Sequence, residues 1–320
     1  MDRRRPGRAG AIRPKARPMT SPPRILCLGA MLWDVIGRSA ARPVPGADMP
    51  GLITRRPGGV ALNVALALAR QGFAPAMLSA VGRDAAGQAL VDEARRQGVE
   101  TRWLWRGGRL PTDSYIAIEG RDGLVAAIAD ARALEGAGAA ILAPLRDGRL
   151  GDAARPWRGT LVLDGNLTAP VLQQIARDPC LSAADLRIVP ASPDKAARLQ
   201  PLLTHPRAVF HLNRAEAEAL AGRPFAGAAE AARALAAQGA RRVLVTDGAR
   251  PAADAAAGAP ILTGTPPAVA ALMVTGAGDC FLAAHLGAEM RGADRARALA
   301  CALRAASAHI SGQATGKDQP

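Results

Sequence analysis

The sequence has few cysteines and no long hydrophobic run. Its four cysteines, Cys27, Cys180, Cys280 and Cys301, are widely spaced and form no CxxC pair. This spacing argues against both a disulfide framework and a zinc site. No apolar run reaches about 18 residues, so the sequence predicts no transmembrane helix. These absences together favour a cytoplasmic protein.

Aromatic residues and lysine are also scarce, and this bears on the strong positive charge. The formal net charge of +14 would be typical of a nucleic-acid-binding protein. Half of that charge lies in residues 1–24, where eight basic side chains accompany one acid, and only three of the 41 basic residues are lysine. Four Phe, four Trp and one Tyr leave little to stack on bases. We therefore expect no nucleic-acid partner and no membrane, and we interpret residues 1–23 as a disordered basic tail.

Several common catalytic patterns are missing as well. There is no GxSxG motif, and the four histidines form neither an HExxH pair nor a triad-like group. Residues 312–317 are one residue too short for a P-loop and lack the Ser or Thr that follows its lysine. The glycines at 136–138 precede an apolar run instead of following one, which argues against a dinucleotide-binding dehydrogenase.

From about residue 24 onward, short apolar runs alternate with longer helical segments. This alternation predicts a mostly parallel sheet covered by helices. The expected strands are 25–28, 76–81, 139–142, 161–163, 187–189, 208–211 and 242–246. The expected helices are 61–71, 85–97, 215–221, 228–238, 279–290 and 295–310.

Two segments, 31–56 and 101–128, do not fit the alternation. Both contain extended, strand-like stretches, although they are far apart in the sequence. We interpret them as a small β lid that is inserted into the α/β domain. A lid of this kind serves reactions that must exclude water.

The most informative segment is VTGAGDCF, residues 274–281, a glycine-containing turn that leads directly into a long helix. The free N–H groups and the positive dipole at a helix start bind phosphate-like anions. Asp279, in the first turn, would lie beside such an anion and could accept a proton from an attacking hydroxyl. The structural alternative is a tight turn followed by an acidic residue that only favours the helix dipole.

Four further motifs accompany this turn: WD at 33–34, PGGVALN at 57–63, NRAE at 213–216 and VTDG at 245–248. In this order and spacing they resemble the ribokinase-like (phosphofructokinase B type) family of carbohydrate and nucleoside kinases. The resemblance implies an α/β, ribokinase-like three-layer fold with a mostly parallel sheet and a small β lid. It also implies a kinase domain at 24–312, with the lid from about 31–56 and 101–128, and a tail at 313–320.

The resemblance implies roles for individual residues. Asp279 would deprotonate the acceptor hydroxyl, and the backbone of Gly276, Ala277 and Gly278 would form an anion hole for the transferred phosphoryl group. The other implied site residues are Asp34, Gly59, Asn63 and Asn166 for the substrate, Asn213, Thr246 and Gly248 for the nucleotide, and Glu216 for the metal. The implied cofactors are ATP and Mg²⁺, with a monovalent cation as a further candidate.

Structural roles remain open for three of these residues. Asp34 could be a turn residue, Asn213 a helix N-cap, and Glu216 its capping-box partner.

A finer resemblance concerns the substrate. Segments 112–118, 127–130, 163–167, 192–199 and 211–216 are similar to bacterial pseudouridine kinases, which phosphorylate the 5′-hydroxyl of a C-glycosidic nucleoside. Val60 stands where ribokinases have lysine, Leu62 where pseudouridine kinases often have arginine, and Cys280 is a third departure.

The sequence therefore predicts an ATP-dependent nucleoside 5′-kinase, with pseudouridine as the first candidate substrate. The alternatives are a kinase for a free sugar or another nucleoside (ribose, adenosine or fructose type) and a catalytically weak regulator that binds a nucleotide or sugar. Since an exposed lid often pairs with a second copy in this family, a homodimer through the lid is the candidate assembly.

Overall fold

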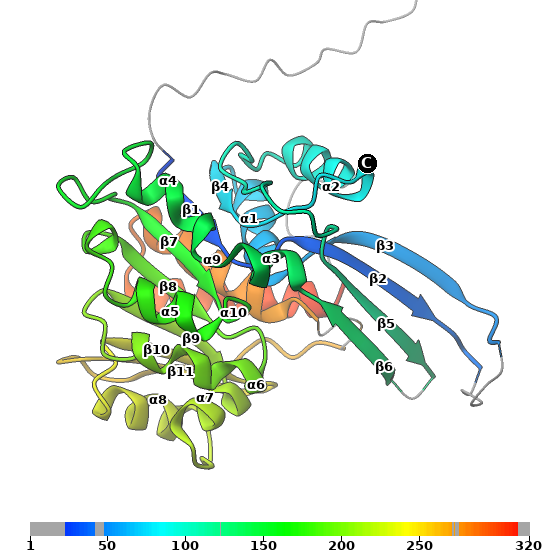
Figure 1. Ribbon diagram of the computed structural model, residues 1–320. Helices are drawn as coiled ribbons and strands as arrows, with labels where there is room; N and C mark the ends of the chain where they lie inside the picture. The colour runs from blue at the N-terminus through cyan, green and yellow to red at the C-terminus, as the bar shows by residue number, and fades with distance from the viewer. Residues whose placement is uncertain (1–22, 42–47, 122, 271, 273–274, 313–320) are drawn as a thin grey trace, which may run out of the picture.

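The computed structural model describes residues 23–41, 48–121, 123–270, 272 and 275–312. The tails expected at 1–23 and 313–320 lie outside these residues, with the exception of Pro23. No helix in the described ranges is long and apolar enough to cross a membrane. The chain forms two sheets, one central and one projecting from the side of the molecule (Figure 1).

The central sheet has eight strands in the spatial order β12-β11-β10-β9-β8-β7-β1-β4. Its strands are β1 Ile25–Leu28, β4 Pro75–Leu78, β7 Thr160–Asp164, β8 Asp185–Val189, β9 Ala208–Asn213, β10 Arg242–Asp247, β11 Arg250–Ala256 and β12 Leu262–Gly264. The six strands from β4 to β10 pair in parallel, whereas β11 and β12 are antiparallel additions. The predicted mostly parallel sheet is therefore confirmed.

Helices cover both faces of this sheet, because successive strand residues point to opposite sides. In β1, Cys27 lies in the core beneath one helical layer, and Leu26 and Leu28 lie in the core beneath the other. The first layer consists of α1 Val60–Arg70, α2 Ala85–Arg96, α9 Ala277–Met290 and α10 Arg295–Ile310. The second consists of α3 Arg132–Ala137, α4 Ala143–Arg146, α5 Ala169–Ile175, α6 Pro193–Ala196, α7 Arg214–Ala221 and α8 Ala228–Ala237, with the 3-10 turns η1 Gly138–Leu142, η2 Pro179–Leu181 and η3 Ala197–Leu202.

The small sheet is the predicted β lid, and its strand order is β3-β2-β5-β6. Its strands are β2 Leu32–Arg38, β3 Leu52–Gly58, β5 Ser114–Gly120 and β6 Gly123–Asp130. β2 and β5 pair in parallel, which joins the two segments that the sequence analysis expected to meet. On the inner face Ile36 and Ala117 are buried opposite each other. On the outer face Ile53 and Ile128 are 75% and 70% exposed, so this face has no covering layer among the described residues.

The order of the central strands indicates where a ligand can bind. From β1 the sheet continues to β4 on one side and to β7 on the other, so the winding direction reverses between β1 and β7. In open α/β sheets, ligands bind in the crevice outside the carboxyl ends of the strands at this switch point. The lid strand β2 also begins at the end of β1, which places the lid over that crevice.

One predicted strand is wrong. Residues 139–142 form part of the 3-10 turn η1, and the sheet runs from β1 directly to β7 without them. Ile141 and Leu142 are buried all the same, in the core beneath the second helical layer. A short apolar run has no periodicity that separates a buried strand from a buried helical turn.

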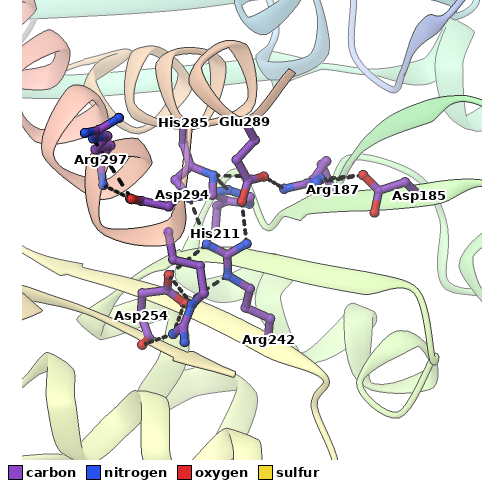
Figure 2. A network of polar contacts seen from close by, with 10 residues as sticks. Asp185, Arg187, His211, Arg242, Asp254, His285, Glu289, Asp294 and Arg297 are labelled. Atoms are coloured by element: carbon purple, nitrogen blue, oxygen red, sulfur yellow. Dashed lines mark hydrogen bonds and ion pairs between the residues drawn. The ribbon is translucent and has the colours of Figure 1, made fainter. Parts of the chain in front are cut away.

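A buried polar network fastens α9 to the sheet (Figure 2). Glu289 of α9 accepts hydrogen bonds from Arg187 of β8 and from Arg242 of β10, both at 2.5 Å. Arg242 Nη2 also donates to Asp254 of β11 at 2.7 Å and lies 3.1 Å from Nε2 of His285. Because buried charges are costly unless they are paired, this set of partners holds the helix in one position on the sheet.

Candidate active site

The turn before α9 is built around Gly276. This residue is the N-cap of the helix and has φ 86°, a left-handed conformation that glycine adopts without strain. A Cβ at this position would also lie 3.3 Å from Nε2 of His309, which donates to the carbonyl of Thr275 at 2.8 Å. No side chain caps the helix start. The first-turn N–H groups, including those of Ala277 and Gly278, are therefore available to an anion.

Asp279 lies in this first turn and is 7% exposed. Its Oδ2 accepts a hydrogen bond from Nδ2 of Asn63 at 2.8 Å. The pKa of Asp279 is raised to about 7, mainly by burial; the Asn63 bond lowers it, and the negative charges of Asp164, Glu216 and Asp34 add to the rise. A carboxylate with a pKa near neutrality is well matched to the work of a general base.

Asn63 reaches Asp279 because α1 begins at a pair of glycines. Gly59 has φ 94°, and a Cβ there would lie 2.4 Å from the carbonyl oxygen of Ala30. A Cβ on Gly58 would lie 2.3 Å from the carboxyl carbon of Asp34. Both glycines are therefore needed where the chain passes from the lid into α1, close against the end of β1 and against Asp34.

Asp34 lies in the lid strand β2, so its alternative interpretation as a turn residue is wrong. Its Oδ2 is 3.7 Å from Nε of Arg56 on β3. Burial raises the pKa of Asp34, and the positive charge of Arg56 lowers it. The lid thus contributes a hydrogen-bond acceptor, Asp34, on the same side of the molecule as Asp279. The negative charge of Asp34 raises the pKa of Asp279.

Asp164, at the end of β7, is a residue that the sequence analysis missed as part of the site. Its side chain is fully buried and accepts hydrogen bonds from the N–H groups of Ala30 at 2.9 Å and Ala61 at 3.1 Å. It also accepts from the N–H of Asn166 at 2.9 Å. A Cβ on Gly29 would lie 2.3 Å from the Asp164 carboxylate. Asp164 therefore joins the ends of β1 and β7 to the start of α1. In the sequence, the feature that could have pointed to this role is an acid directly after an apolar run.

The residues expected at the nucleotide lie together further along the same edge. The parallel register pairs Thr246 of β10 with Asn213 of β9, and Gly248 follows in a left-handed turn with φ 60°. Asn213 and Glu216 form a capping box, in which Asn213 Oδ1 accepts from the Glu216 N–H and Glu216 Oε2 accepts from the Asn213 N–H. The structural interpretation of these two residues is therefore confirmed, although it does not exclude a second role.

Glu216 is the residue best suited to a metal near the nucleotide. It is 7% exposed, and burial raises its pKa to about 7. Its Oε1 has no hydrogen-bond partner among the described residues. No group of three or more His, Cys, Asp or Glu side chains in the described ranges could hold a metal alone. Such a sparse donor set fits Mg²⁺, which binds through one or two carboxylates together with substrate phosphates.

A cavity of about 410 Å³ lies elsewhere, between α1, α9 and α10. Cys280 lines it, but none of the expected site residues does. The candidate site is therefore defined by side-chain contacts at the sheet edge, not by this cavity.

The comparison with known families agrees with this geometry. The description "pfkB family carbohydrate kinase" fits residues 22–320, nearly the whole chain. This chain belongs to the pfkB family of carbohydrate kinases. Among solved structures, a carbohydrate kinase from Agrobacterium tumefaciens is similar, with a TM-score of 0.75, 29% identity and coverage of 92% of this chain and 94% of that chain.

Two curated relatives of this pfkB-family chain match over shorter stretches. An uncharacterized sugar kinase of Escherichia coli, YeiI, is 32% identical over 169 residues, which are 52% of this chain and 45% of that protein. A pseudouridine kinase of Arabidopsis thaliana is 35% identical over 66 residues, 21% of this chain and 18% of that protein. The matched part thus spans less than half of the length of either relative.

Proposed function

We propose that this pfkB-family protein is an ATP- and Mg²⁺-dependent kinase that phosphorylates the 5′-hydroxyl of a nucleoside, with pseudouridine as the acceptor. The observation that carries the proposal is Asp279, a buried carboxylate with a pKa of about 7 beside a helix start whose N–H groups are free. The family membership and the partial match to a pseudouridine kinase support it.

In the proposed reaction, Asp279 accepts the proton of the substrate hydroxyl as that oxygen attacks the terminal phosphorus of ATP; the bond from this phosphorus to the bridging oxygen breaks, and ADP leaves. The N–H groups of Gly276, Ala277 and Gly278 hold the transferred phosphoryl group, because developing negative charge is stabilised by donors that already point at it. Asp34, Asn63 and the backbone at Gly59 hold the ribose hydroxyls, and this fixes the angle of attack.

On the nucleotide side, Thr246, Gly248 and Asn213 would line the ATP, and Glu216 would hold Mg²⁺. When bound, Mg²⁺ neutralises charge on the phosphate oxygens. Burial disfavours the ionised form of Glu216 and raises its pKa to about 7, and a cation bound beside it would offset this by stabilising the carboxylate.

A free-sugar kinase is the second candidate function. The stretch similar to the sugar kinase YeiI covers 52% of this chain, against 21% for the pseudouridine kinase. Both candidates use the same base and anion hole and differ only in the acceptor.

The test is a screen of ATP consumption with pseudouridine, uridine, cytidine, adenosine, ribose and fructose, with Mg²⁺ and with EDTA. We expect the highest kcat/KM with pseudouridine, no turnover with EDTA, and no turnover by Asp279→Ala. A higher kcat/KM with ribose or fructose would establish the sugar-kinase alternative. Binding of nucleoside and ATP without any turnover would instead identify a regulator.

A further inference from the structure

Two polar side chains, one of which has no assigned role, lie where β7 and β8 end. Asn166 follows β7, and Lys195 lies in α6, which follows β8. Nζ of Lys195 donates to Oδ1 of Asn166 at 2.6 Å, and both residues are half-buried. Since β7 and β8 are neighbouring parallel strands, their ends meet at the sheet edge that carries the candidate site.

Lys195 has no acidic partner. The only hydrogen bond of its ammonium among the described residues is to the neutral amide of Asn166, and no carboxylate oxygen in these residues lies within 4.0 Å of that ammonium. Many arginines of the protein, by contrast, form ion pairs, as Arg187 and Arg242 do. A partly buried ammonium without an anion is costly to desolvate, and a ligand that supplies oxygen acceptors would compensate for it.

The bond to Lys195 also fixes the orientation of Asn166. Lysine can only donate, so Asn166 must present its oxygen to Lys195 and its NH₂ group elsewhere. The free part of the pair then consists only of donors: the amide of Asn166 and the remaining N–H bonds of Lys195. A group that binds here has to carry oxygen acceptors.

This donor pair is connected to the candidate base by a set of hydrogen bonds and by the first turn of α1. Asn166 donates its backbone N–H to Asp164, Asp164 also accepts from the N–H of Ala61 at the start of α1, and Asn63 of the same helix donates to Asp279. The two ends of the set have opposite polarity. Asp279 and Asp34 accept hydrogen bonds and suit hydroxyl groups, whereas Lys195 and Asn166 donate them.

The backbone around the pair has two unusual features, a positive φ and a close approach between two turns. Ala191, in the turn between β8 and α6, is the one described residue other than glycine with a positive φ, at 76°. A Cβ on Gly165, next to Asn166, would lie 2.1 Å from the carbonyl oxygen of Pro190. The two turns therefore approach each other closely, and this approach brings Lys195 onto Asn166.

We propose that Lys195 and Asn166 form a specificity site that binds oxygen acceptors of the acceptor substrate, either base carbonyls or a carboxylate. The inference rests on the proposed kinase function and names the substrate class: an acceptor molecule with a hydroxyl end and an oxygen-acceptor end. Free ribose and fructose lack the second end.

The test compares Lys195→Met and Asn166→Leu with wild type on pseudouridine, uridine, gluconate and ribose. We expect kcat/KM for the favoured acceptor-bearing substrate to fall by about 10–100-fold, because a substrate oxygen loses its partner. For Lys195→Met, the KM for ATP and the kcat/KM for ribose should stay within about twofold. Lys195→Arg should restore part of the loss, and Arg241→Met, which removes an exposed charge at the start of β10, is the matched control.

The substrates separate the two sources of acceptor oxygens. A selective loss with pseudouridine and uridine identifies base carbonyls, and a salt-sensitive loss with gluconate identifies a carboxylate. An equal loss with ribose, or a raised KM for ATP, would overturn the proposal and place Lys195 at the phosphates. An unchanged kcat/KM for every substrate would overturn it as well.

Calorimetric binding separates this inference from the proposed function. If wild type turns over none of the substrates but binds one, and Lys195→Met abolishes that binding at an unchanged Tm, the kinase proposal fails and the specificity site stands. If wild type turns over ribose or fructose alone and binds neither nucleoside nor gluconate, the kinase proposal stands and the specificity site fails.

Discussion

A carboxylate that acts as a base at neutral pH has to be kept away from both bulk water and strong cationic partners. Asp279 meets both conditions, because it is buried and, among the residues that the structure describes, its side chain accepts a hydrogen bond only from the neutral amide of Asn63. The same environment affects the stability of the folded protein. Its raised pKa means that between the usual 3.8 and about 7 the folded chain holds a proton that the unfolded chain has released. The free energy of unfolding therefore falls as the pH rises through this range.

Asp279→Asn should thus affect activity and stability in opposite directions. We expect kcat to fall by about 10²–10⁴-fold, the usual scale for a positioned general base, with a smaller change in substrate KM. At pH 8 the Tm should rise, since a buried charge is removed. Steady-state kinetics and thermal melts at pH 5 and pH 8 measure both effects. A variant with normal turnover would show that Asp279 is not the base and acts only as an acidic residue in the first turn of the helix.

Asp34 gives a second test, on the substrate side of the site. Asp34→Ala should lower kcat/KM for the acceptor by about 10–100-fold, because a bound hydroxyl loses its acceptor. The KM for ATP should change little, since the residues expected at the nucleotide lie at the ends of β9 and β10. Initial rates with each substrate varied in turn separate the two constants. A loss of ATP affinity with normal acceptor affinity would show that the two subsites are assigned in reverse.

Much of the site could be predicted from local sequence, because Gly59, Gly276 and Asp279 belong to turns with strong backbone requirements. Asp164 could not. Its importance comes from three N–H groups, one just after β1, one in the first turn of α1 and one just after β7, and only the folded sheet brings them together. Lys195 was noticed only as part of a segment typical of one subfamily, and its contact with Asn166 likewise depends on the pairing of β7 with β8.

At the scale of elements, the strands that sequence reasoning missed are those with weak intrinsic preference. β11 reads RPAADAA, and its alanines and aspartate disfavour a strand. It forms because a tight turn after β10 folds it back antiparallel, and because Arg242 and Arg295 satisfy the buried carboxylate of Asp254. Tertiary contacts of this kind leave no periodic signal in the sequence.

Helix α9, which contains Asp279, also contains two residues of the polar network in Figure 2. His285 and Glu289 lie one turn apart in the second half of α9. His285 is fully buried between Arg242 and His211, and burial lowers its pKa to about 4. The pKa of His211 is also lowered, first by burial and then by the neighbouring His285.

This network predicts acid sensitivity of the fold. Between the usual 6.5 and about 4, the unfolded chain binds a proton at His285 that the folded chain does not, so the free energy of unfolding falls as the pH falls. His285→Gln keeps a polar side chain but cannot titrate, and it should reduce the difference in Tm between pH 7 and pH 5. The double variant with His211→Gln should reduce it further. Unchanged pH dependence in both variants would contradict this account.

At the scale of the whole molecule, the lid is the part that projects furthest from the sheet (Figure 1). The register places Ile53 and Ile118 on either side of Gly37, and Ile116 opposite Ile128, all on the outer face. An exposed apolar face of this kind is typical of a surface that binds a partner.

We expect two copies of the chain to pair through this face. Sedimentation at micromolar concentration should then give a dimer, and Ile128→Glu should give a monomer, because a charge cannot be buried against an apolar partner. Met290→Glu, an exposed apolar position on α9, is the matched control and should leave the dimer intact. A monomeric wild type, or a dimer unaffected by Ile128→Glu, would rule this face out.

The hydrogen bond between Asn63 and Asp279 spans 216 positions of the chain, and this separation matters while the protein is being made. Leu62 and Leu66 of α1 belong to the same core cluster as Leu282 and Leu286 of α9. At roughly 5–20 residues per second on the ribosome, α1 would wait on the order of 10–40 s before α9 emerges to cover it. During that interval the nascent chain exposes an apolar helix face that chaperones can bind, and the base acquires its partner only near the end of synthesis.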